Sequence, residues 1–251
     1  MTDRPVLAVE QLELTIGGAR IIDGVTLEVA QGEMLGVIGP NGAGKTTLFN
    51  LISGVMTPTA GRVLLEDRDV TAEAIHTRAR AGLGRTFQTS SLFPALSALE
   101  NVRLAAQVSL GGSLSVIRFP RATDDATRIA RERLDEVGLS HHAETDAGVL
   151  SHGDKRKLEI AMLLATDPRV ILLDEPMAGV ASGDVRGLSD VIRSVHKSGR
   201  TVLMVEHHMD VVLGLVDRVA VMHHGQLLAC DTPAAVMANP AVQSAYLGES
   251  L

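Results

Sequence analysis

A glycine-rich stretch near residue 40 has the residue types needed to hold a chain of phosphates. It reads Gly39-Pro40-Asn41-Gly42-Ala43-Gly44-Lys45-Thr46, a complete G-x-x-x-x-G-K-[ST] pattern. Glycines let backbone N–H groups turn inward on a polyanion, and the positive end of a following helix adds to that concave surface. We expect Lys45 to reach the β- and γ-phosphates of a nucleotide and the Thr46 hydroxyl to bind Mg²⁺, with Thr47 completing the contact. The alternative is a glycine-rich turn without function.

Two carboxylates follow a second apolar run, Val170-Ile171-Leu172-Leu173-Asp174-Glu175-Pro176. A buried strand of this kind delivers both acids to the carboxyl edge of a sheet, where open α/β folds bind ligands. Asp174 is suited to hold a Mg²⁺-bound water, and Glu175 is the candidate to orient or deprotonate an attacking water. The alternative is a strand that ends in two solvated acids. The presence of a phosphate loop with Lys45 in the same chain strongly disfavours that alternative.

The elements that must position these residues follow from the hydrophobic pattern. Short apolar runs alternate with amphipathic helical stretches, which is typical of a parallel sheet covered by helices. The predicted core strands are 34–38, 170–173, 201–205 and 219–222, and 7–14, 24–29 and 62–66 are predicted to form an antiparallel patch. Strand patterns stop between residues 89 and 150. There 122–137 predicts an amphipathic helix that ends at Gly138, so we expect an inserted helical subdomain.

Composition excludes several classes of protein. The chain has 251 residues, 45% of them hydrophobic, which favours one large globular domain. The single cysteine, Cys230, cannot form an internal disulfide, and the N-terminus lacks the layout of a signal peptide, so we expect a reducing compartment. No apolar run approaches the roughly 20 residues of a membrane span. The net charge of −7 argues against a nucleic-acid surface.

Four further segments, in a fixed order, make the chain resemble the ATPase subunits of ABC transporters. They are Arg85-Thr86-Phe87-Gln88, 150–160, Ala178-Gly179-Val180-Ala181, and His207 after the run 201–206. The resemblance implies a P-loop NTPase (RecA-like) core over about 1–88 and 163–251, with an antiparallel β subdomain and a helical subdomain over about 89–162. It implies that Gln88 touches the Mg²⁺ site and that His207 contacts the γ-phosphate. It also implies hydrolysis of ATP with Mg²⁺ as cofactor.

The segment 150–160 resembles the family's signature sequence. Ser151 and Asp154 have the S-x-x-D form of a helix N-cap, so a helix is expected through Ala165 in any case. The resemblance implies that the Ser151 hydroxyl and the Gly153 amide point at the γ-phosphate bound to Lys45 of another copy. The working form would then be a head-to-tail dimer closed by ATP, with an identical or paralogous second subunit.

The chain departs from the family pattern in three places. No aromatic residue precedes Phe49, and Ile16 lies where a residue that stacks on adenine is expected, which favours loose selection between ATP and GTP. His152 and Asp154 replace the usual Gly and Gln, and the spacing predicts that Asp154 turns into the helix cap. Ala181, in the segment 178–181, lies where the family has a polar residue. Adjacent histidine pairs lack acids or cysteine at ligand spacing, so we expect no metal other than Mg²⁺.

Within the family, the segments 85–93, Asn239-Pro240 and 245–249 resemble the ATPases of branched-chain amino-acid importers and their urea or amide relatives. The resemblance implies membrane permease partners, an extracytoplasmic solute-binding protein that acts indirectly, and a place on the cytoplasmic face of a membrane. It implies that a permease loop docks on the block 89–110. Two alternatives stay open: an ABC ATPase that handles nucleic acid, and a nucleotide-dependent switch without useful hydrolysis.

Overall fold

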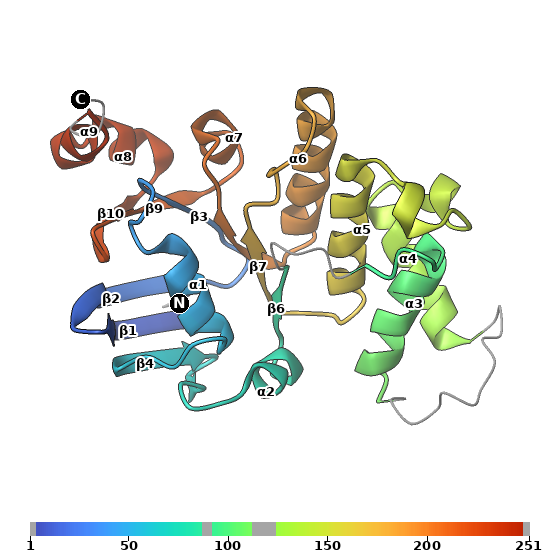
Figure 1. Ribbon diagram of the computed structural model, residues 1–251, viewed down its shortest axis with the longest axis horizontal. Coiled ribbons are helices and arrows are strands. Elements are labelled where there is room, and N and C mark those ends of the chain that lie inside the picture. Colours follow the sequence, from blue (N-terminus) through green and yellow to red (C-terminus); the bar gives the residue numbers. More distant parts are fainter. Residues whose placement is uncertain (1–3, 87–91, 112–123, 248–251) are drawn as a thin grey trace. The chain divides into compact units, whose positions relative to one another are not determined.

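The chain forms two compact units in the computed structural model, which describes residues 4–86, 92–111 and 124–247 (Figure 1). Unit 1 consists of Met1–Arg85, Arg169–Glu175 and Gly199–Leu251, and unit 2 of Thr86–Pro168 and Pro176–Ser198. Unit 2 therefore takes in residues 176–198 as well as the middle of the chain. The expected limits of the helical subdomain, 89–162, stay a prediction.

A six-stranded sheet with the order β10-β9-β3-β8-β7-β6 lies in unit 1. Its strands are β3 (Met34–Ile38), β6 (Leu83–Arg85), β7 (Val170–Asp174), β8 (Thr201–Val205), β9 (Arg218–His223) and β10 (Gln226–Asp231). Neighbours from β6 to β9 pair in parallel, and β10 pairs antiparallel with β9. Every residue of β3, β7 and β8 is buried, as uninterrupted apolar runs predict for central parallel strands. All four predicted core strands are confirmed.

A second, four-stranded sheet of unit 1 has the order β2-β1-β4-β5 and is antiparallel. Its strands are β1 (Pro5–Ile16), β2 (Ala19–Ala30), β4 (Ala60–Leu65) and β5 (Arg68–Asp69). Burial along the second half of β2 alternates residue by residue, which is the pattern of a sheet with one packed face. The predicted antiparallel patch is confirmed, and its strands extend beyond the predicted limits.

The helices of unit 1 include α1, which starts at the phosphate loop. They are α1 (Lys45–Ser53), α2 (Ile75–Arg80), α7 (Met209–Leu213), α8 (Pro233–Ala238) and α9 (Pro240–Leu247). Helix α1 contacts both β2 and β7, and its apolar side chains are fully buried in the core shared by the two sheets. The core therefore fixes the helix whose first turn carries Lys45 and Thr46.

Arg78 of α2 ties down the other end of α1. Its side chain is almost completely buried, at 1% exposure. The guanidinium donates to four carbonyl oxygens, those of Leu51, Ile52, Thr71 and Glu73, over 2.6 to 3.1 Å. Two of these carbonyls belong to the last turn of α1, where a helix leaves acceptors unsatisfied and favours a positive charge.

We expect Arg78→Met to lower the free energy of unfolding by at least about 3 kcal/mol, because it leaves buried carbonyl oxygens without a hydrogen-bond donor. Urea unfolding followed by circular dichroism measures the change. Arg80→Met, at an exposed position of the same helix, is the control and should stay within about 0.5 kcal/mol of the wild type. Equal stabilities of the two variants would contradict this role for Arg78.

Unit 2 is helical. It contains α3 (Ala98–Ser109), α4 (Asp125–Glu136), α5 (His152–Leu164), α6 (Ser182–Lys197) and the short 3₁₀ turns Ser140–His142 and Ala147–Val149. Side chains cap three of the helices: Ser97 accepts from the Glu100 amide, Asp124 from the Thr127 amide and Ser151 from the Asp154 amide. The predicted helix before Gly138 is α4, which begins at Asp125. In the described residues, no helix is both long and apolar enough to cross a membrane.

Candidate functional site

The phosphate loop lies between β3 and α1 of unit 1, and its backbone requires glycine. Gly39 has a φ of 151°, and a Cβ there would lie 2.2 Å from the Met222 carbonyl oxygen. Gly42 and Gly44 also have positive φ angles, of 79° and 98°. Backbone conformations of this kind allow successive amides to face one concave surface, which is the arrangement that binds phosphate.

Lys45 is the first residue of α1, and its side chain crosses back over the loop. Its Nζ donates to the carbonyl oxygens of Gly39, at 2.6 Å, and Pro40, at 2.8 Å. The residue is 5% exposed. The ammonium group is therefore held at the loop whose amides are placed for phosphate. Thr46 and Thr47 follow in the first turn of the same helix.

Asp174 is the last residue of β7, beside the end of β8, and Glu175 follows it directly. Asp174 pairs in register with Val205, and the Glu175 amide donates to the Val205 carbonyl at 2.9 Å. The Asp174 side chain is 1% exposed. Glu175 has a φ of 48°, a left-handed conformation that is uncommon for a residue other than glycine and is found at functional sites. The chain thus turns sharply at the residue predicted to act on water.

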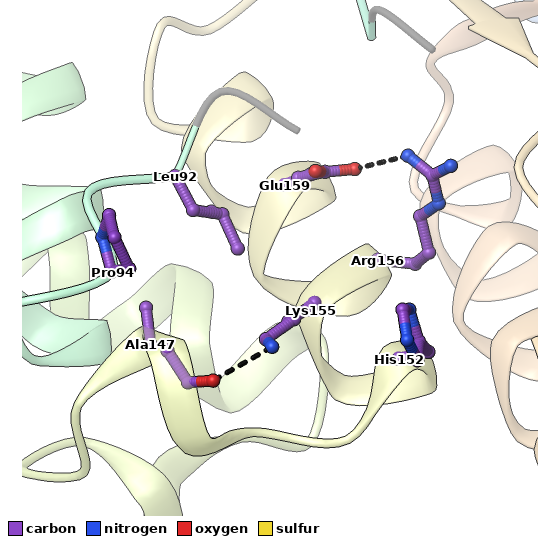
Figure 2. Close-up of a pocket in the computed structure, with 8 residues that line it drawn as sticks. Leu92, Pro94, Ala147, His152, Lys155, Arg156 and Glu159 are labelled. Atoms are coloured by element: carbon purple, nitrogen blue, oxygen red, sulfur yellow. Dashed lines mark hydrogen bonds and ion pairs between the residues drawn. The ribbon is translucent and has the colours of Figure 1, made fainter. Parts of the chain in front are cut away.

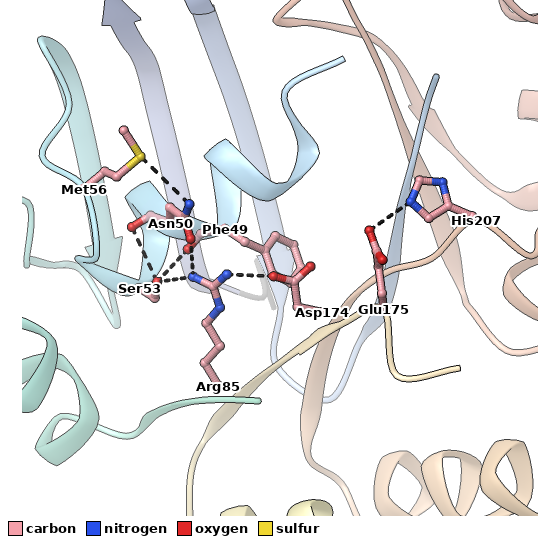
Figure 3. A network of polar contacts seen from close by, with 8 residues as sticks. All are labelled: Phe49, Asn50, Ser53, Met56, Arg85, Asp174, Glu175 and His207. Atoms are coloured by element: carbon pink, nitrogen blue, oxygen red, sulfur yellow. Dashed lines mark hydrogen bonds and ion pairs between the residues drawn. The ribbon is translucent and has the colours of Figure 1, made fainter. Parts of the chain in front are cut away.

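His207 and Glu175 are in direct contact, although they are 32 residues apart in sequence. His207 Nε2 lies 2.9 Å from Glu175 Oε1, as Figure 3 shows. Glu206, which is 3% exposed, accepts from the His207 amide at 3.0 Å and so anchors the backbone after β8. The structure brings together two residues that were predicted on different grounds, Glu175 from its place after a buried strand and His207 from the family resemblance.

Arg85 is a member of this site that had no predicted role. It ends β6, and its Nη2 donates to Asp174 Oδ2 at 2.7 Å (Figure 3). Burial raises the pKa of Asp174 above its usual range, and the ion pair with Arg85 opposes that rise. The only sequence signal was its place three residues before Gln88. Gln88 itself lies outside the described residues.

Asp174 and Thr46 suit a hard cation. Mg²⁺ keeps several waters and takes one or two carboxylates together with substrate phosphates, so it needs no dedicated cage of side chains. A buried carboxylate at the sheet edge and a hydroxyl at the start of α1 are oxygen donors of that kind. Within the described ranges, no group of three or more His, Cys, Asp or Glu is placed to bind a metal ion.

The predicted signature residues lie in unit 2, at the start of α5. Ser151 Oγ accepts from the Asp154 amide at 3.1 Å and donates to Asp154 Oδ2 at 2.8 Å, so the predicted cap is confirmed. Burial acts to raise the pKa of Asp154, but hydrogen bonds from Ser151 and Lys157 outweigh it and the pKa lies below its usual value. A Cβ at Gly153 would lie 2.9 Å from the Asp184 Cβ, which explains the glycine.

The remaining predicted positions have simple surroundings. Ile16 is the last residue of β1 and is 52% exposed, so it is available to a base. Ala181 is the N-cap of α6 and has no side-chain hydrogen bond to the helix. The pair His223 and His224 leads into Gly225 at the turn of the hairpin formed by β9 and β10.

A pocket of about 450 Å³ lies in unit 2 (Figure 2). It is lined by Leu92, Pro94, Ala147, Gly148, His152, Lys155, Arg156 and Glu159. Lys155 Nζ donates to the Gly148 carbonyl at 2.8 Å, and Arg156 pairs with Glu159 at 2.8 Å. Both cations are thus engaged by the protein, and Leu92, Pro94, Ala147 and His152 line the pocket beside them.

Two family models match the chain. The model described as ABC transporter matches residues 22–178, and the one described as branched-chain amino acid ATP-binding cassette transporter matches residues 226–251. The first covers the phosphate loop and the Asp174–Glu175 pair. The second covers the tail that the sequence had singled out.

Related proteins match over nearly their whole length. A high-affinity branched-chain amino acid transport ATP-binding protein, LivG of Salmonella typhimurium, is 38% identical over 253 residues, 98% of this chain and 99% of the relative. The lipopolysaccharide export ATP-binding protein LptB of Escherichia coli is 34% identical over 243 residues, 97% of each chain. The ADP conformation of the ATP-binding cassette MJ1267 superposes with a TM-score of 0.86 at 32% identity, covering 97% of this chain and 99% of that one.

Proposed function

Because the chain belongs to the family of ABC transporter ATP-binding subunits, we propose that it powers import of branched-chain amino acids or related small polar solutes. One observation supports the ATPase chemistry above all: the phosphate loop, the Asp174–Glu175 pair and His207 follow the carboxyl ends of three adjacent parallel strands, β3, β7 and β8. That edge is where open α/β sheets bind their ligands. The match of the tail, residues 226–251, favours the amino-acid importers.

Different residues of the chain have different roles in ATP hydrolysis. The amides of 39–44 and Lys45 hold the β- and γ-phosphates, as a nest at a helix start can do. Glu175 accepts a proton from the attacking water as the new bond to the γ-phosphorus forms, and the bond to the leaving ADP oxygen breaks. His207, 2.9 Å from Glu175, orients that carboxylate and lies beside the γ-phosphate.

Thr46, Asp174 and Gln88 would hold Mg²⁺. When bound, the ion supplies charge neutralisation between the β- and γ-phosphates. Asp174 contributes a buried carboxylate and Thr46 a hydroxyl, both suited to a hard ion. Ile16, exposed at the end of β1, contacts the base by its aliphatic side chain.

A second ATPase subunit, identical or paralogous, would complete each site. Ser151 and Gly153 at the start of α5 would meet the γ-phosphate bound to the partner copy, with the positive end of the helix toward it. Lys157 pairs with the Asp154 carboxylate and offsets its negative charge, and Ser151 would exchange its hydrogen bond to that carboxylate for one to the phosphate. ATP would then close a head-to-tail dimer, and hydrolysis would loosen it.

Permease subunits would supply the membrane path, with the chain on the cytoplasmic face. The docking block, 89–110, contains two apolar residues of the pocket wall, Leu92 and Pro94. A loop from a permease would dock there, and a solute-binding protein would act through the permease alone. The net charge of −7 disfavours a role on nucleic acid.

Uptake of radiolabelled leucine tests the proposal. We expect deletion of the gene to abolish high-affinity uptake, and a plasmid copy to restore it. A copy with Glu175→Gln should not restore it, although the protein accumulates to the same level. Unchanged leucine uptake in the deletion strain would contradict the proposed solutes, and restoration by Glu175→Gln would contradict coupling to hydrolysis.

A further inference from the structure

Arg85 joins three elements of unit 1 through its guanidinium group (Figure 3). Its Nη2 donates to Asp174 Oδ2 of β7 at 2.7 Å. Its Nη1 donates to two residues of α1, Asn50 Oδ1 at 2.8 Å and Ser53 Oγ at 2.6 Å. The strand β6 therefore reaches the phosphate-binding helix and the Asp174 carboxylate with one side chain.

The contacts to α1 fix the orientation of the guanidinium. Ser53 Oγ donates to the Phe49 carbonyl at 2.7 Å, which leaves a lone pair of the hydroxyl oxygen for Arg85. The Phe49 ring lies under the group, with its centroid 5.9 Å from the Arg85 Cζ. A planar guanidinium held on one side by α1 presents its other side to Asp174 in a defined geometry.

Stability alone is a weak reason for this ion pair. The Arg85 and Asp174 side chains are 6% and 1% exposed, and a pair this deeply buried gains little over apolar residues of the same size. The pair is also placed on the last residue of β7, directly before Glu175. A charged arrangement retained at that position is better explained by the chemistry of the carboxylate.

We infer that Arg85 is a positioning residue that fixes the Asp174 carboxylate for binding of Mg²⁺-nucleotide. The inference rests on the proposed role of Asp174 at the cation. Because Arg85 holds Oδ2, the carboxylate cannot rotate freely, and its orientation is set before the ligand arrives. Outer-shell partners of this kind typically change metal affinity or activity 10–100-fold when they are removed.

Binding of ADP to the full chain, measured with and without Mg²⁺, tests this inference. We expect Arg85→Met to raise the Mg²⁺ concentration for half-saturation in the presence of ADP by about 10–100-fold. ADP affinity in EDTA should stay as in the wild type, because the contacts of Arg85 described above are made to Asp174 and to the second half of α1. The Mg²⁺ requirement of Arg85→Lys should lie between those of the wild type and Arg85→Met, since lysine keeps the charge but loses the forked arrangement of guanidinium donors. Mn²⁺ bound in place of Mg²⁺, followed by electron paramagnetic resonance, gives an independent readout.

Two further variants separate positioning from loss of folding. Arg103→Met removes another buried arginine, which pairs with Glu100 at 2.8 Å in unit 2, and should leave the Mg²⁺ requirement unchanged. Asn50→Ala keeps Arg85 but removes one of its anchors, and should shift the Mg²⁺ requirement in the same direction by less. Asn50→Ala serves as the test variant if Arg85→Met does not fold.

Asp174→Asn distinguishes the possible failures. If Asp174→Asn shifts the Mg²⁺ requirement and neither Arg85→Met nor Asn50→Ala does, the positioning role is overturned while the cation role of Asp174 stands. An equal loss of ADP affinity with and without Mg²⁺ in Arg85→Met also overturns the inference. If Asp174→Asn has no effect on the Mg²⁺ requirement, the proposed role of Asp174 fails first.

Discussion

Glu175→Gln is expected to lower the rate of ATP hydrolysis by about 10²–10⁴-fold while the protein still binds Mg-ATP. Glutamine has nearly the same shape but cannot accept a proton, and general-base catalysis contributes a factor of this size. A steady-state phosphate-release assay measures the rate, and equilibrium binding of ATP measures the affinity. The variant should also form a stable dimer with ATP on size-exclusion chromatography, because the nucleotide that closes the dimer persists.

Glu10→Gln is the control for Glu175→Gln. Glu10 is an exposed carboxylate of β1 that pairs with Arg62, and its loss should leave hydrolysis unchanged. Hydrolysis by Glu175→Gln at the wild-type rate would remove Glu175 from its role. Wild-type chain that binds ATP and dimerises without measurable turnover would instead favour a nucleotide-dependent switch.

Lys45→Met is expected to weaken ATP binding by about 10–100-fold and to slow hydrolysis by about 10²–10³-fold. A charge-assisted hydrogen bond contributes roughly 1.5–3 kcal/mol to binding, which corresponds to the expected loss of affinity. Loss of one hydrogen-bond donor to the charge that develops in the transition state slows a reaction by about 10²–10³-fold. Methionine keeps the length of the side chain and removes only the charged end. Fluorescence of a labelled ATP analogue measures the affinity, and phosphate release measures the rate.

Lys155→Met is the matched control for Lys45→Met. Its Nζ also donates to a backbone carbonyl, that of Gly148, but it belongs to α5 of unit 2. The nucleotide affinity of Lys155→Met should equal that of the wild type. If Lys45→Met bound ATP as tightly as Lys155→Met, the phosphate loop would not be the nucleotide site.

The sequence alone determined the parts of this protein that depend on neighbouring residues. The phosphate loop, the core strands and the cap of α5 are patterns within a few residues. Ser151 and Asp154, for example, are three residues apart, and their hydrogen bonds follow from helix geometry. Uninterrupted apolar runs likewise identified the buried strands before any partner strand was known.

Tertiary structure decided which distant residues meet. His207 contacts Glu175 across 32 residues and Arg85 contacts Asp174 across 89, and no local pattern encodes either contact. Both arise because β6, β7 and β8 are neighbours in the sheet, which places the ends of strands from separate parts of the chain side by side. The sequence could place Asp174 at the end of a strand. The parallel order of that sheet brought Arg85 to its carboxylate and His207 to Glu175.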